Sequence, residues 1–150
     1  MPRSCEPVRL RRATDGAAPR LVTTVAAYHD EEFLTILFSA ADDHVVATHY
    51  GHDEPLYEED VVEAFLAPRH KAQYFEIEVN PAGTTFDARI DSPDGVRSTM
   101  IADIGWECEG LVAAVRKMIS SRNRMTIDTL IRVPFASVGS TAPEDGHSWL

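Results

Sequence analysis

Basic side chains are scarce in this sequence of 150 residues, which contains 14 Lys and Arg against 24 Asp and Glu. The formal net charge at pH 7 is -10. Binding to nucleic acid or to anionic lipid without sequence preference depends on clustered Lys and Arg. We therefore expect neither nucleic acid nor a membrane surface as a partner.

Long apolar runs are also lacking. Apolar stretches such as residues 34–38 and 61–66 fall far below the roughly 20 residues needed to cross a bilayer. Arginines stand at positions 3, 9, 11 and 12, but no apolar segment of the length that a secretory signal requires follows them. As written, the sequence predicts a cytoplasmic protein.

Cysteine is nearly absent, since only Cys5 and Cys108 occur and they lie far apart. Their positions lack the paired spacing of a zinc site or a redox motif. Without an export signal we expect two reduced thiols, with Cys108 partly buried.

Turn-forming residues separate short apolar runs throughout the chain, a rhythm typical of many strands. The length fits one domain. We expect an irregular lead-in over residues 1–20, with at most one short strand, and a single domain over residues 21–150. Strands are expected over residues 21–28, 33–40, 45–50, 61–66, 74–79, 85–91, 98–104, 111–117 and 125–133. With little amphipathic helix, this pattern predicts an all-β fold, an antiparallel β-sandwich.

Residues in the middle of the chain alternate in character, which predicts the two faces of a sheet. One face is apolar and is expected to be the core: Val62, Ala64, Leu66, Phe75, Ile77, Val79, Phe86, Ala88 and Ile90. The other is charged and aromatic and is the candidate binding surface: Glu63, Phe65, Tyr74, Glu76, Glu78, Asp87, Arg89 and Asp91.

A sugar is recognised by aromatic faces that cover its C–H surfaces and by planar polar groups that bridge its hydroxyls. The aromatic candidates are Trp106, Tyr57, Tyr74 and Phe65, with Trp106 as a cap over the sheet. The polar candidates are Glu63, Glu76, Arg89 and Asn80. The alternative is that the aromatics complete the packing and that the charges form cross-strand pairs such as Glu76 with Arg89.

Two groups of residues suggest metal chemistry. Residues 53–63 hold six carboxylates and no Lys or Arg, and the weak calcium candidates among them are Glu58, Glu59 and Asp60. Their spacing is not that of an EF-hand, and a solvated acidic loop is the alternative. The spacing of His44, His49 and His52 matches no metal motif, so we assign no metal to them.

Four segments in chain order resemble the carbohydrate-binding family 9-like domains. They are residues 56–66, residues 74–83 with 86–89, residues 103–111, and residues 131–138 with their Val-Pro-Phe sequence. The resemblance implies a β-sandwich of the DOMON-like class, often extracellular and often attached to or encoded beside glycoside hydrolases. It also implies that aromatic side chains bracket a sugar and that calcium can stabilise loops. Relatives commonly have Trp where Tyr57 stands.

We therefore predict a non-catalytic module that binds a saccharide, requires no cofactor and has a glycoside hydrolase as a further partner. One alternative is a glycoside hydrolase, which needs two carboxylates about 5 to 9 Å apart. Glu63 and Glu76 on adjacent strands would suit it, although no nucleophile motif, phosphate loop or cofactor fingerprint accompanies them. The other is a protein-interaction or structural domain without sugar binding, because a fold does not fix a function.

Overall fold

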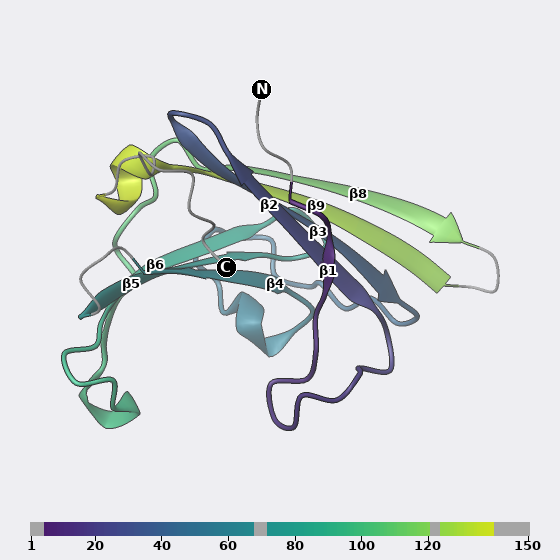
Figure 1. The fold of residues 1–150 in the computed structure, drawn as a ribbon, viewed down its shortest axis with the longest axis horizontal. Coiled ribbons are helices and arrows are strands. Elements are labelled where there is room, and N and C mark those ends of the chain that lie inside the picture. Colours follow the sequence, from purple (N-terminus) through teal and green to yellow (C-terminus); the bar gives the residue numbers. More distant parts are fainter. Residues whose placement is uncertain (1–4, 68–71, 121–123, 140–150) are drawn as a thin grey trace.

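A computed structural model describes residues 5–67, 72–120 and 124–139 of the chain as two facing antiparallel sheets (Figure 1). The larger sheet has the order β1-β2-β3-β9-β8, and the smaller has the order β4-β5-β6-β7. The strands are β1 (Val8–Arg9), β2 (Thr23–His29), β3 (Phe33–Asp42), β4 (Val62–Leu66), β5 (Gln73–Val79), β6 (Thr85–Asp91), β7 (Ile101–Asp103), β8 (Val112–Ser120) and β9 (Arg124–Pro134). The predicted antiparallel β-sandwich is confirmed.

Helical structure among the described residues is limited to three short 3-10 turns, as the sequence predicts. They are η1 (Leu56–Glu58), η2 (Arg97–Thr99) and η3 (Phe135–Val138). In this part of the chain, no helical segment has the length or apolar character that crossing a bilayer requires.

The strand predicted over residues 45–50 is wrong, because this segment forms an irregular connection. The N–H groups of Val46 and Thr48 donate to the carboxylates of Asp60 and Glu59, so they are not available to a neighbouring strand. The strand predicted over residues 98–104 shortens to β7, since η2 precedes it. Strand β9 ends at Pro134, as expected of a residue that cannot donate to a ladder.

The main core lies between the two sheets. Leu34, Ile36 and Phe38 of β3 and Ile131 and Val133 of β9 face the smaller sheet. Ala64, Phe75, Ile77 and Val79 meet them from β4 and β5. All nine of these side chains are buried, while Val62 and Leu66 are half-buried. The predicted parity of β4 and β5 is therefore confirmed.

The predicted parity of β6 is wrong. In β5 and β6 the register pairs Phe75 with Arg89 and Ile77 with Asp87, and paired residues share a face of the sheet. Phe86, Ala88 and Ile90 therefore point away from the larger sheet, while Asp87 and Arg89 point toward it. The length of the turn over residues 80–84 sets this register, which apolar alternation alone does not reveal.

The outward side chains of β6 are buried nonetheless, because a second cluster covers them. Leu56 of η1 is completely buried against Phe86, Ala88 and Ile90. Figure 1 shows η1 on the side of β4, β5 and β6 away from the larger sheet. We call this side of the smaller sheet the outer face and the side toward the larger sheet the inner face.

Candidate functional site

A cavity of about 490 Å³ opens on the outer face, and we call it the outer pocket. Its walls come from β5, β6, β7 and the segment that leads into η1. The lining residues are Asp53, Pro55, Tyr57, Glu76, Phe86, Ala88, Ile90, Ala102 and Ile104. The pocket thus combines a mostly apolar wall with two carboxylates and a tyrosine.

Aromatic side chains surround the outer pocket and its flank. Tyr57 is 60% exposed, and the edge of its ring meets Phe86 at 6.3 Å between centroids. Tyr74 lies on the same face, where its ring is 6.1 Å from that of Phe65 and its hydroxyl is 3.8 Å from the Met100 sulfur. Tyr57 therefore has a free surface for a ligand, whereas Tyr74 is held by packing.

Three glutamates of β4 and β5 share the outer face. Glu63 is opposite Glu78 in the register, and Glu76 is two pairs further along, opposite Phe65. Burial, then the charges of Glu63 and Glu76, raise the pKa of Glu78 to about 8. Burial and then the charge of Glu63 also raise the pKa of Glu76. At neutral pH the buried Glu78 is thus mostly protonated beside the partly exposed Glu76.

The structure brings together only some of the predicted site residues. Tyr57, Glu63, Tyr74 and Glu76 share the outer face, but Trp106 and Arg89 do not. The Trp106 ring is 4.7 Å from that of Phe75 and is packed against the main core. Arg89 points inward and pairs with Asp103 at 2.8 Å, so the suggested pair of Arg89 with Glu76 is wrong.

Asn80 has a structural position in the turn between β5 and β6. Its buried Oδ1 accepts the N–H groups of Ala82 at 3.0 Å and Thr84 at 2.9 Å. Its Nδ2 donates to the carbonyl oxygen of His49 at 2.8 Å. These bonds use both lone pairs of Oδ1 and one of the two Nδ2 hydrogens, so Asn80 fixes the turn and has little left to offer a ligand.

The calcium candidates hold the connection that precedes β4. Glu59 accepts the N–H and hydroxyl of Thr48, and Asp60 accepts the N–H of Val46. Glu58 is exposed on η1. The bonds to Glu59 and Asp60 occupy oxygens that a calcium ion would need, so they do not favour this site. Calcium at these residues stays a prediction.

Both cysteines are free in the structure. Cys5 is exposed and Cys108 is buried. Burial, then the charge of Asp87, raise the pKa of the Cys108 thiol to about 12. Cys108 is therefore protonated at neutral pH and behaves as a small apolar side chain.

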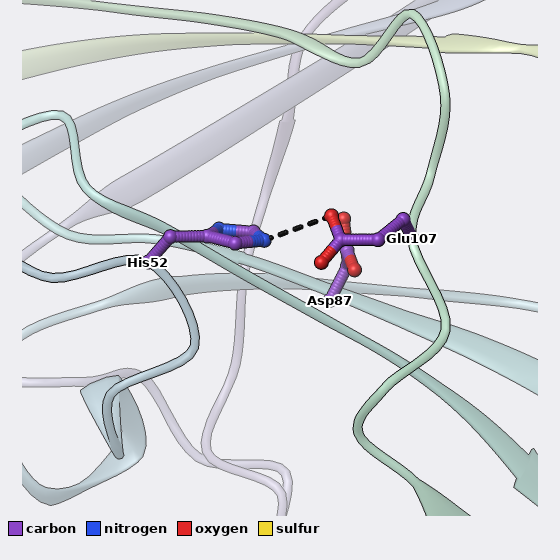
Figure 2. Close-up of side chains that lie close together, drawn as sticks. All are labelled: His52, Asp87 and Glu107. Carbon is purple, nitrogen blue, oxygen red and sulfur yellow. Dashed lines mark hydrogen bonds and ion pairs between the residues drawn. The ribbon is translucent and has the colours of Figure 1, made fainter.

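A second polar cluster lies where the inner face of β6 meets two loops (Figure 2). His52 comes from the segment before η1, Asp87 from β6 and Glu107 from the loop before β8. One nitrogen or oxygen atom from each lies within 4.8 Å of the others. The sequence gives no reason to group His52 with residues other than the nearby His44 and His49. The members of this cluster are 20 to 55 positions apart and share no motif.

Trp106→Ala should lower the stability of the domain by about 2 kcal/mol, because the ring is half-buried and full truncation of a buried aromatic costs about 3 to 5 kcal/mol. Urea unfolding of the variant measures this loss. Tyr50→Ala, at a tyrosine that is 76% exposed, is the control and should be nearly neutral. An unchanged unfolding midpoint for Trp106→Ala would contradict the packed position of this side chain.

Comparison with known proteins agrees with the fold and gives the family. A solved structure of a Bacteroides uniformis protein with a provisional carbohydrate-binding assignment superposes with a TM-score of 0.62 at 13% identity. The match covers 87% of this chain and 60% of that protein, so this chain spans less than two thirds of its length. No curated protein matches the sequence. The family model for carbohydrate-binding family 9 matches residues 15–130, which is most of the chain. The chain belongs to carbohydrate-binding family 9.

Proposed function

We propose that this domain binds a saccharide in the outer pocket, without catalysis, and that it serves a glycoside hydrolase. Family membership supports a carbohydrate ligand. Tyr57 supplies a flat exposed ring, and Glu76 supplies a carboxylate that accepts hydrogen bonds from sugar hydroxyls. Glu63 lies beside Glu76 and extends the polar part of the surface.

The observation that carries this proposal is the composition of the outer pocket. Ligand sites are concave and mostly apolar, with a few polar groups that fix orientation. Here the floor is rigid, because it consists of side chains of β6 that are buried against Leu56 of η1. These side chains are Phe86, Ala88 and Ile90. Ligand orientation then depends on Glu76 and Tyr57.

Tyr57→Ala should weaken saccharide binding by at least about tenfold, because loss of an aromatic contact of about 1.4 kcal/mol already gives that factor. A glycan array, with and without calcium, first identifies a soluble saccharide that binds the parent protein. Isothermal titration calorimetry then compares the parent with Tyr57→Ala and Glu76→Gln. Tyr50→Ala replaces an exposed tyrosine that does not line the pocket and should bind as the parent does.

Three results would contradict parts of the proposal. Equal binding by the parent and Tyr57→Ala would place the ligand elsewhere. Hydrolysis of the bound saccharide would favour the glycosidase alternative, in which Glu63 and Glu76 are the reacting carboxylates. A parent protein that binds no saccharide would favour the protein-interaction alternative.

A further inference from the structure

We propose that His52, Asp87 and Glu107 bind a divalent transition metal ion of the zinc type, with Asp53 beside them. This inference does not rest on the saccharide proposal, although Asp53 also lines the outer pocket. Figure 2 shows the three side chains directed toward a common point from three different segments.

The imidazole of His52 is oriented as in a metal ligand. Its Nδ1 lies 2.9 Å from the carbonyl oxygen of Thr85 and 3.0 Å from the Thr85 hydroxyl. A carbonyl oxygen only accepts, so Nδ1 carries the proton. Metal-binding histidines typically donate one ring N–H to a carbonyl or carboxylate in this way, which directs the other nitrogen at the ion. In His52 that nitrogen is Nε2, the atom that faces the cluster.

Carboxylate oxygens surround Nε2 at short distances. The Glu107 Oε2 is 3.0 Å away and the Asp53 Oδ1 is 3.4 Å away. Ligand atoms about 2.1 Å from a tetrahedral zinc ion lie about 3.4 Å apart. Two carboxylate oxygens therefore lie at close to this spacing from Nε2, and an Asp87 oxygen lies within 4.8 Å of the His52 and Glu107 ligand atoms. With Nδ1 already protonated, Nε2 needs a second proton to donate to the Glu107 carboxylate, and the two groups then form an ion pair. A metal ion would take the place of that proton.

Asp87 provides an independent indication of a missing ligand. Its side chain is only 1% exposed, and its Oδ2 accepts the N–H of Cys108 at 3.2 Å. Its Oδ1 is buried and has no hydrogen-bond partner among the described residues. A buried carboxylate oxygen without a partner costs free energy, and a bound cation would remove that cost.

The donor set selects the class of metal. Calcium and magnesium prefer oxygen ligands, and calcium takes six to eight of them. One imidazole nitrogen with two or three carboxylates instead suits zinc and similar transition metals. The site also has an entrance, because the side chain of Glu107 is 59% exposed while Asp87 closes the base.

The test is calorimetric titration of the EDTA-treated, dialysed protein with zinc chloride. We expect one ion per chain. Glu107→Gln and His52→Gln should each weaken zinc binding by at least about 100-fold, since even outer-shell changes at metal sites cost 10- to 100-fold. His44→Gln, which removes an exposed histidine outside the cluster, should leave the affinity unchanged. Glu107 is exposed, so its variant tests the ligand without disturbing the core.

Cobalt provides a second measurement. The cobalt-loaded parent protein should have visible absorption bands typical of cobalt bound by nitrogen and oxygen ligands. The Glu107→Gln variant should lack these bands. No stoichiometric zinc binding, or zinc binding that survives both variants, would overturn the proposal. A protein that binds calcium but not zinc would overturn the assignment of the metal. Retention of zinc by Tyr57→Ala would show that the two sites are independent.

Discussion

Phe75→Ala should lower the free energy of unfolding by about 3 to 5 kcal/mol, a large part of the stability of a domain of this size. Phe75 is only 4% exposed and lies in the main core, where it is opposite Leu66 in the register and its ring contacts that of Trp106. Truncation removes its contacts and leaves a cavity between the sheets. Urea unfolding followed by fluorescence or circular dichroism measures the change.

Phe65→Ala is the matched control for this prediction. Phe65 lies on β4, the neighbouring strand, but points to the outer face and is 57% exposed. Its truncation should cost about 1 kcal/mol or less, because little apolar surface is withdrawn from water there. A larger loss for Phe65→Ala than for Phe75→Ala would mean that the inner and outer faces are exchanged, and equal losses would contradict the burial of Phe75.

Raising the pH from about 4.5 to 8 should remove roughly 3 to 5 kcal/mol of stability, because Glu78 must lose its proton beside Glu63 and Glu76. The side chain is completely buried, and the pKa is raised to about 8 from an ordinary value of 4.5. A carboxyl with a raised pKa binds its proton more tightly in the folded state. Its stabilising contribution is therefore complete below pH 4.5 and is lost as the pH rises through 8. Each unit of pKa shift corresponds to about 1.4 kcal/mol.

Glu78→Gln removes this charge but keeps the shape of the side chain. Its urea midpoint should be higher than that of the parent protein at pH 8, and the difference should shrink toward pH 4.5. Glu58→Gln, at an exposed position of η1, should follow the parent protein across the range. The urea midpoint of the parent protein should fall relative to that of Glu78→Gln as the pH rises. If it does not, Glu78 ionises in the folded protein without a cost in stability.

Sequence alternation predicted the sandwich and much of its core. The parity of β4 and β5 could be predicted because Val62 to Leu66 and Phe75 to Val79 place every apolar group but Phe65 on one face. The same rule failed for β6, where apolar residues lie on the outer face and Asp87 and Arg89 on the inner one. Alternation assumes that the apolar face of a strand meets the main core. Here Leu56 of η1, which is distant in sequence, forms a second apolar cluster on the opposite face of β6.

The candidate site was only partly predictable for a related reason. Strand parity and family resemblance were enough to place three site residues on one surface. These residues are Glu63, Glu76 and Tyr57. The position of Trp106 depends on the path of a loop, which no periodicity describes. The cluster of His52, Asp87 and Glu107 depends on the inward direction of Asp87, so the error in β6 concealed it.

Strand β6 is covered on both sides, by apolar packing on the outer face and by polar contacts on the inner face, and this limits how its sequence can change over time. Phe86, Asp87, Ala88 and Ile90 are all buried, and Arg89 is partly so. An ordinary strand of a sandwich has one solvent-facing row in which mutations accumulate freely, as β8 has along most of its length. Over residues 86–90, β6 has no such row. We therefore expect the sequence of β6 to diverge slowly among related proteins. All positions from 86 to 90 should be constrained, whereas in an ordinary strand only every second position is.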